Sequence, residues 1–384
     1  MRIPYAYLDK QFADPAPFLA DIEKLVRTGD FTLGYPVREF EERFAQLTGL
    51  PYAIGVSSGT DALILSLKIH DIGHGDEVIT AVNTFVASAG AIAMIGATPV
   101  FVDNNDEYTI DVDQIEAAIT PRTRAIVPVH LTGMPADMPR IMEIAERHNL
   151  IVVEDAAQAI LATIDGRHVG NWGAAAGFSM HPLKNLNIWG DGGVILTRSE
   201  ELRDRLRLIR NHGLKNRDEI ELWGYNSRLD SIQAVVANRL IDQAPAITER
   251  RRANARYFDA ALAELPEYVT LPPRRPGFDP VYHTYVIQAA DRDALYQYLL
   301  DNEIEVKIHY PIPLHLQPAA RPLGYKAGDF PVCERHCQTI LTLPVHEHLT
   351  QPELEYMVEK IRSFYVGRGA KVSAAASAAL PQRG

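Results

Sequence analysis

Short apolar runs alternate with amphipathic helical patterns between residues 53 and 210, and this alternation leaves few folds open to the chain. The runs predict strands at 53–56, 77–80, 100–102, 125–129, 151–153, 175–180 and 194–197. The segments around them predict helices at 61–68, 86–95, 111–119, 137–148 and 200–210. Because the predicted strands are apolar on both faces, we expect an α/β fold: a mostly parallel central sheet with helices on both faces.

The pattern changes after about residue 240. A charged helical stretch, with Pro245 as its expected kink, precedes a proline-rich segment and a second set of patterns. These predict helices at 232–262, 291–302 and 351–364, and strands at 284–287 and 306–308. They indicate a smaller C-terminal α+β domain.

The expected domain boundaries follow from these changes. The large domain spans 31–240 and the small domain spans 241–366, and residues 1–30 pack on the small domain or across both. Residues 367–384 lack hydrophobic periodicity, so we expect a disordered tail there.

Charge and composition exclude several classes of partner. The formal net charge of −11 argues against a nucleic-acid or anionic-membrane surface. Two cysteines cannot form a disulfide framework, so we expect a cytoplasmic protein, and the first residues contain no apolar stretch that would predict a secretion signal. The uncharged stretch 78–102 contains Asn83, Gly90, Gly96 and Pro99, which favour a helix, a turn and a strand over a membrane span.

Three short motifs carry possible chemistry. The small-residue turn 57–61 lies between a strand and a helix, where it either binds a phosphate or caps the helix. Asp155 follows a buried strand directly and is either a ligand-binding carboxylate or a helix cap. Lys184 lies in a proline-broken loop before a glycine-rich turn, either as a lowered-pKa amine that forms a Schiff base or as a solvated lysine.

Together, the three motifs match the needs of pyridoxal 5′-phosphate (PLP). This cofactor requires an anchor for its phosphate, a carboxylate that keeps its ring nitrogen protonated, and a lysine amine. The turn at 57–61 would anchor the phosphate, Asp155 would supply the carboxylate and Lys184 would supply the amine.

The chain resembles the DegT/DnrJ/StrS family of PLP-dependent sugar aminotransferases, which share the type I aspartate-aminotransferase fold. The resemblance rests on seven segments in family order, at 58–63, 83–85, 154–159, 179–185, 190–193, 224–230 and 309–317. It implies that the fold consists of a PLP-binding domain and a smaller C-terminal domain.

The resemblance also implies roles for individual residues. Ser58, Gly59, Thr60 and Ser179 would hold the cofactor phosphate, and Lys184 would carry the cofactor covalently and transfer protons.

The cofactor ring would have its own set of contacts. Phe85 would stack on it unless it is only a core residue, Asp155 would pair with its nitrogen, and Gln158 would reach its hydroxyl. Asn226 matches an asparagine that reaches the cofactor phosphate of the neighbouring subunit, so the resemblance implies a homodimer with shared active sites.

The implied reaction moves the amino group of L-glutamate, or L-glutamine, onto a keto-sugar. The acceptor is either nucleotide-linked or a free or phosphorylated keto-sugar, such as a keto-octulosonate or a keto-hexose phosphate, because residues 160–162 depart from the usual family pattern. Two alternatives stay open. One is a dehydratase, against which Lys184 argues because dehydratases of the family carry histidine there; the other is a non-catalytic regulator that only binds a ligand.

The remaining candidates are weaker. His309 and His181 are candidate substrate contacts, whereas His346 and His348 suggest a solvated loop. No metal site is expected, since Cys333 and Cys337 lack further ligands in chelating positions. The arginines at 203, 205, 207 and 210 are expected on the solvated face of a helix.

Overall fold

A seven-stranded sheet forms the centre of the computed structural model, which describes residues 1–378. All of its strands are parallel except β9, which runs antiparallel between β1 and β8. In spatial order they are β1 (Tyr52–Val56), β9 (Gly193–Thr197), β8 (Ala175–Ser179), β5 (Ile151–Asp155), β4 (Thr123–Val127), β2 (Glu77–Ala81) and β3 (Thr98–Val102). The predicted mostly parallel α/β sheet is confirmed.

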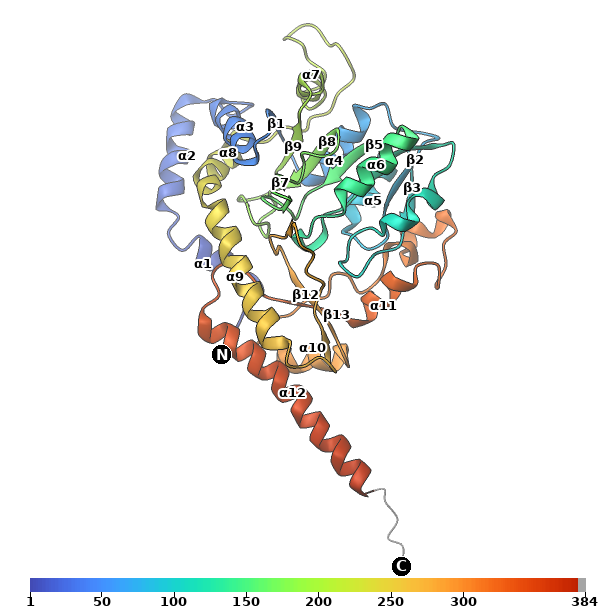
Figure 1. Cartoon of the computed structure of the whole chain (residues 1–384). Coiled ribbons are helices and arrows are strands. Elements are labelled where there is room, and N and C mark those ends of the chain that lie inside the picture. Colours follow the sequence, from blue (N-terminus) through green and yellow to red (C-terminus); the bar gives the residue numbers. More distant parts are fainter. Residues whose placement is uncertain (379–384) are drawn as a thin grey trace, which may run out of the picture.

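Helices cover both faces of this sheet (Figure 1). They are α3 (Tyr35–Thr48), α4 (Gly59–Lys68), α5 (Val86–Met94), α6 (Met138–His148), α7 (Glu200–Ile209) and α8 (Ser231–Leu240). Side chains cap several of them: Ser58 accepts a hydrogen bond from the backbone N–H of Asp61 at the start of α4, and Ser199 does the same for Leu202 in α7. The caps fix where each helix begins relative to the strand before it.

A second hydrophobic core lies below the sheet in Figure 1 and contains the C-terminal elements. An antiparallel sheet in the order β10 (Val269–Thr270), β12 (Tyr285–Ala289) and β13 (Ile340–Leu343) packs with α9 (Ala244–Leu262), α10 (Arg292–Asp301) and α12 (Gln351–Ala378). The helix α11 (Pro331–Thr339) lies between the two cores, where Asp103 at the end of β3 accepts hydrogen bonds from the N–H groups of Val332 and Cys333.

The N-terminal segment contacts both parts of the molecule. Ile3 forms a parallel bridge with Ile304, whereas Phe18 on α2 (Ala16–Thr28) belongs to the hydrophobic core that packs on the seven-stranded sheet. Between them lies the short helix α1 (Leu8–Gln11).

Several expected elements differ in the structure. The helix predicted at 111–119 is replaced by two 3₁₀ turns, Val112–Gln114 and Glu116–Ala118, because Pro121 disfavours helical backbone just before it and leaves too short a segment. The helix predicted at 232–262 is interrupted by a 3₁₀ turn at Ile241–Gln243, and Pro245 lies in the first turn of α9, where proline is tolerated.

Three other differences involve pairing or propensity. Residues 306–308 form only an isolated bridge, Lys307 to Thr342, and a small sheet of β6 (Thr163–Ile164), β7 (Arg167–His168) and β11 (Phe278–Asp279) was not predicted. The predicted disordered tail is helical as far as Ala378, since α12 continues through an alanine-rich stretch of high helix propensity. The rest of that tail, 379–384, lies outside the described residues.

The arginine cluster also departs from its predicted solvated face at one position. Arg210 is buried and pairs with Glu41, and its Nη1 donates to the carbonyl oxygen of Gly55 at 2.6 Å. Within the described residues, no helix is long and apolar enough to cross a membrane.

Candidate active site

The carboxyl ends of β1, β2, β5 and β8 open into one cavity of about 450 Å³. Parallel strands place their carboxyl ends at one edge of a sheet, which is where such sheets bind ligands. The cavity brings together ten of the predicted site residues: Ser58, Gly59, Thr60, Phe85, Asp155, Gln158, Ser179, His181, Lys184 and His309. Asn226 is the exception; it is exposed on the loop between α7 and α8 and does not line this cavity.

The start of α4 forms a close-fitting cradle. A Cβ atom added at Gly59 would lie 2.7 Å from the Cβ of Ser179, so only glycine lets these two segments approach so closely. The first turn of a helix leaves backbone N–H groups without helical partners and carries a partial positive charge. The cradle therefore suits a phosphate group, with the hydroxyls of Thr60 and Ser179 on its walls.

Asp155 is the last residue of β5 and is buried in the cavity wall. Its Oδ2 accepts a hydrogen bond of 2.6 Å from the Oγ of Ser88 on α5, and its Oδ1 accepts one from the N–H of Ala157. These contacts fix a buried carboxylate where it can pair with a cationic ring nitrogen. Ser88 was missed; the only signal for it is a hydroxyl in an otherwise apolar helix.

The preceding residue, Glu154, points to the other side of the strand and anchors it. Its carboxylate accepts hydrogen bonds from the N–H groups of Gly170, Trp172 and Gly173 at 2.7–2.9 Å, and it lies 3.0 Å from Nε2 of the buried His130. Burial alone would raise the pKa of Glu154, but His130 and the backbone N–H groups outweigh it and hold that pKa below its usual range.

Lys184 lies in the loop after β8 and lines the cavity. Burial lowers its pKa to about 8, although the negative charge of Asp155 acts in the opposite direction. Two asparagines hold the loop: Asn185 donates to the carbonyl oxygen of Val281, and Asn187 binds both Pro182 O and the side chain of Gln11. The geometry thus favours the reactive amine over the solvated lysine.

Gln158 is oriented by the turn that follows β4. Its Oε1 accepts a 2.7 Å hydrogen bond from the N–H of Thr132, so the amide NH₂ is the donor end of the side chain, and it also reaches Tyr310. Thr132 and Gly133 both have positive φ, at 63° and 90°, and the carbonyl of Gly133 accepts a hydrogen bond from the N–H of Val281. Sequence reasoning missed this turn because no local pattern marks it.

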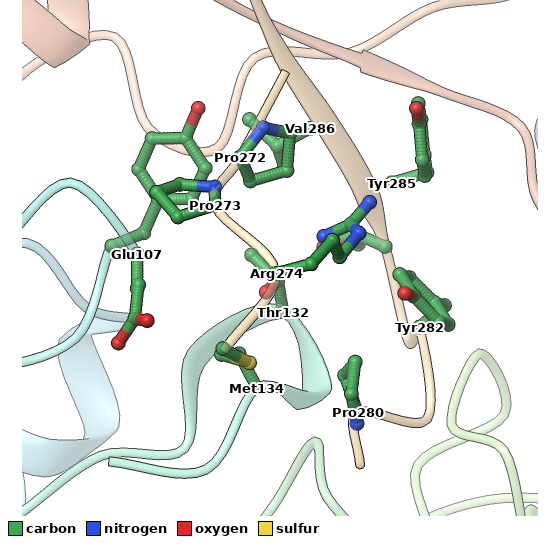
Figure 2. Close-up of a pocket in the computed structure, with 12 residues that line it drawn as sticks. Glu107, Thr132, Met134, Pro272, Pro273, Arg274, Pro280, Tyr282, Tyr285 and Val286 are labelled. Atoms are coloured by element: carbon green, nitrogen blue, oxygen red, sulfur yellow. The ribbon is translucent and has the colours of Figure 1, made fainter. Parts of the chain in front are cut away.

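A much smaller cavity of about 20 Å³, room for about one water molecule, lies where this turn meets the small domain. Figure 2 shows Thr132 and Met134 across from Pro272, Pro273 and Tyr282. Glu107, Arg274 and Tyr285 also line this cavity, but it is too small for a ligand larger than water, and we assign it a packing role.

Neutral histidines and one tyrosine complete the wall opposite the sheet. Burial first, and then the charge of Lys184, lowers the pKa of His309 to about 4 and also lowers that of His181. His283 was missed, and its pKa is lowered by burial and by Lys184 as well. Tyr310, also missed although it follows His309 directly, has its pKa raised to about 12 by burial and by the charge of Asp155.

Phe85 is the N-cap residue immediately before α5 and remains 53% exposed, with its ring centroid 6.1 Å from that of Tyr310. A core phenylalanine would be covered, so this ring is available to stack on a ligand.

No group of three or more metal-ligating side chains occurs in the part of the chain that the structure describes. The sulfur atoms of Cys333 and Cys337 lie 4.0 Å apart, and both cysteines are buried and free.

The match to a protein-family model decides the assignment. Residues 14–362 match the model of the DegT/DnrJ/EryC1/StrS aminotransferase family. The chain belongs to this family. Its members' chemistry agrees with the cradle, carboxylate and amine described above, and the predicted resemblance is confirmed.

Curated relatives agree with this assignment. The chain is 42% identical to a UDP-N-acetyl-3-dehydro-α-D-glucosamine 3-aminotransferase of Acidithiobacillus ferrooxidans, over 90% of this chain and 92% of the relative. It is 41% identical to a Geobacillus stearothermophilus protein named a pleiotropic regulatory protein, over 95% of this chain and 99% of the relative.

Two solved structures have nearly the same fold as this chain. The Streptomyces venezuelae protein DesV has a TM-score of 0.92 at 40% identity, covering 94% of this chain and 98% of DesV. A Bacillus subtilis protein solved with pyridoxamine phosphate has a TM-score of 0.88 at 30% identity, covering 94% of this chain and 84% of that one. The protein is a PLP-dependent sugar aminotransferase.

Proposed function

We propose that the enzyme transfers the amino group of L-glutamate to carbon 3 of a nucleotide-linked 3-keto-hexose. The observation that carries this proposal is the amine of Lys184 beside Asp155 in a cavity large enough for more than an amino acid. An open depression of about 200 Å³ shares Thr84, Phe85 and Tyr310 with that cavity and offers further room for a sugar with a nucleotide. The Acidithiobacillus relative, named for a UDP-linked 3-keto-sugar, supports the choice of acceptor.

The residues divide the work between binding and proton transfer. Bound PLP stabilises the negative charge that develops on the donor's Cα when its proton leaves. The cradle at Gly59 and Thr60 would hold the phosphate, Asp155 would keep the ring nitrogen protonated, and the NH₂ group of Gln158 would donate to the ring hydroxyl.

Lys184 moves the proton. With a pKa near 8, part of the population carries a neutral Nζ at neutral pH, and this amine can accept a proton from Cα and return it elsewhere. The same residue serves in the opposite direction when the keto-sugar is the substrate. The donor leaves as a keto acid and the keto-sugar gains the amine, so the two half-reactions balance.

The test separates the two half-reactions. Absorption spectra of the purified enzyme, recorded with L-glutamate or L-glutamine, report the donor step, and mass spectrometry of the sugar product reports the acceptor step. We expect conversion by L-glutamate, followed by amination of a dTDP- or UDP-linked 3-keto-hexose and not of a keto-hexose phosphate. Amination of the phosphate ester alone would overturn the proposed acceptor.

Neither alternative gains support from the site. A non-catalytic regulator, which the name of the Geobacillus relative suggests, would have no need for a lysine of lowered pKa in the same cavity as a buried aspartate. The dehydratase alternative requires a different residue where Lys184 stands.

We also propose that two copies share their active sites in the cytoplasm. The loop carrying Asn226 protrudes at the top of Figure 1 and exposes Trp223 by 90%, together with Ile220 and Tyr225. Exposed apolar side chains of this size favour a protein interface. Mixing inactive Lys184→Ala and Asn226→Ala proteins should restore activity, because a mixed dimer contains one intact site; no recovery after confirmed subunit exchange would contradict shared sites.

A further inference from the structure

A second cavity, of about 70 Å³, adjoins the active-site cavity and shares Leu183, His283 and His309 with it. Its other walls include Tyr5 from the N-terminal segment, Arg251 from α9, and His346 from the loop after β13. We call it the polar cavity. The loop at 346–348 is not the solvated loop that the sequence predicts, since His346 is buried and its ring stacks on Tyr7 at 4.8 Å.

Arg251 brings a buried positive charge to this cavity, with one donor to spare. Its Nε donates to Glu347 at 2.9 Å, its Nη1 donates to the carbonyl oxygens of Tyr282 and His283, and its Nη2 donates to the hydroxyl of Tyr7. A guanidinium has five N–H donors, so one N–H on Nη2 has no partner among the described residues.

Other polar atoms in the polar cavity also lack partners within the described chain. The hydroxyl of Tyr5 makes no hydrogen bond there, and Nδ1 of His283 is buried without one. His309 contacts Thr342 through Nδ1, at 3.0 Å, and either nitrogen of each neutral ring can carry the proton. Buried polar groups are nearly always paired, so Nδ1 of His283 together with the spare N–H of Arg251 indicates a ligand.

One unpartnered acceptor is also present. Nε2 of His346 contacts the carbonyl oxygen of Pro4 at 3.4 Å, so this nitrogen carries the proton and Nδ1 is the acceptor. The hydroxyl of Tyr5 can donate to only one group at a time.

We propose that the polar cavity binds the side-chain carboxylate of the amino donor and so selects L-glutamate over L-glutamine. The inference rests on the proposed function and specifies its donor. A carboxylate brings only acceptors, which match the spare N–H of Arg251 and the hydroxyl of Tyr5. A carboxamide would offer the guanidinium only a neutral oxygen, and so a weaker hydrogen bond. His283 and His309 line both cavities, and the charge of Lys184 acts on both of them, so a donor with its Cα near the lysine amine can extend its side chain into this cavity.

Tyr5→Phe tests the proposal, because it removes a hydroxyl that has no partner in the chain. We expect the L-glutamate concentration for half-maximal donor conversion to rise about tenfold, as for loss of one hydrogen bond to a charged group. The rate of the keto-sugar half-reaction should stay unchanged, and so should L-glutamine conversion. Tyr356→Phe on α12 is the matched control, because Tyr356 does not line the polar cavity and its hydroxyl donates only to Asn302 O.

A binding measurement does not depend on turnover or on any variant. Glutarate carries two carboxylates and no amine, so it cannot react; calorimetric titration of the holoenzyme should show it binding at least about tenfold more tightly than butyrate, which lacks the second carboxylate. Normal L-glutamate conversion in Tyr5→Phe, or equal binding of the two acids, overturns the polar cavity as the donor site and leaves the proposed function standing. A wild-type enzyme that no amino acid converts would overturn both.

Discussion

Asp155 and Lys184 face the same cavity, but different kinds of contact hold them. Asp155 ends a central strand, and its own N–H and C=O groups bond to Pro128 and His130 on the adjacent chain segment. Lys184 lies in a loop fixed by Asn185 to Val281 and by Asn187 to Gln11, contacts that join residues 96 and 176 positions apart. The sheet wall of the cavity is therefore built by local strand order, and the loop wall by contacts between distant parts of the chain.

Replacing Lys184 with alanine should have the largest effect on activity and little effect on the fold. The variant loses the amine that moves the proton, so we expect turnover to fall by about 10⁴-fold or more. Stopped-flow absorption with L-glutamate would measure the loss, and circular dichroism would confirm an intact sheet. A variant that retains a tenth of wild-type turnover would show that another residue transfers the proton.

The difference between the sheet wall and the loop wall also explains which parts of the site the sequence could predict. Strand ends and caps are encoded by neighbouring residues, so the turn at Gly59, Asp155 and the parallel sheet were accessible from local patterns. Thr132, His283 and Tyr310 were not, because their places depend on contacts between segments far apart in the sequence, such as the hydrogen bond from the N–H of Thr284 to the carbonyl oxygen of Thr132.

Other residues needed more than local patterns. The roles of Phe85, Gln158 and Asn226 came only from the family resemblance, and local periodicity gave no sign of them. The burial of Arg210 and His346 was missed for another reason: each has a partner, Glu41 or Tyr7, that lies far away in the sequence.

The next largest effects are on the free energy of unfolding, and they compare two buried carboxylates: Glu154 in the central sheet and Glu347 beside Arg251. Glu154→Gln disturbs the carboxylate that accepts three backbone N–H groups beside His130, so we expect about 3 kcal/mol less free energy of unfolding. Glu347→Gln, which weakens the buried pair with Arg251, should cost less because Arg251 keeps its three other hydrogen bonds. Urea titration measures both. Equal losses of free energy of unfolding would mean that the two carboxylates stabilise their parts of the molecule equally.

The amine of Lys184 should titrate unlike an ordinary lysine. A pKa of about 8 instead of 10.5 gives roughly 300-fold more neutral amine at pH 7. In the cofactor-free enzyme, its acylation rate should be half-maximal near pH 8, as followed by peptide mass spectrometry. Between these two pKa values the unfolded chain binds more protons, so the stability of the cofactor-free enzyme should rise with pH there and not below. Half-maximal labelling above pH 10 would show a solvated lysine.

Gly133→Ala tests the turn that links the two walls. A Cβ there would lie 2.9 Å from Val281 Cγ2 and 3.0 Å from the N–H nitrogen of His283, and φ is +90°. We expect about tenfold slower turnover, because the added Cβ would displace Gln158 and His283, and misplaced active-site groups slow the reaction. Gly166→Ala, also at positive φ but with no atom near its Cβ, controls for backbone strain alone. Equal effects in the two variants would rule out a specific role for the turn.

We expect the smallest effect at the contact of the loop wall whose two residues, Gln11 and Asn187, are furthest apart in the sequence. Gln11 and Asn187 exchange two hydrogen bonds of 2.8 Å, and Asn187 also donates to Pro182 O two residues before Lys184. Gln11→Leu removes both bonds and should slow turnover about two- to fivefold, corresponding to about 1 kcal/mol.

Lys10→Ala is the control for this contact, since Lys10 lies on the same short helix and forms only an ion pair with Glu353. In a double-mutant cycle, Gln11→Leu and Asn187→Leu should show a coupling of about 1 kcal/mol in the activation free energy. Additive effects on turnover would mean that the N-terminal segment stabilises the small domain without positioning Lys184, and the loop wall would then depend on Val281 alone.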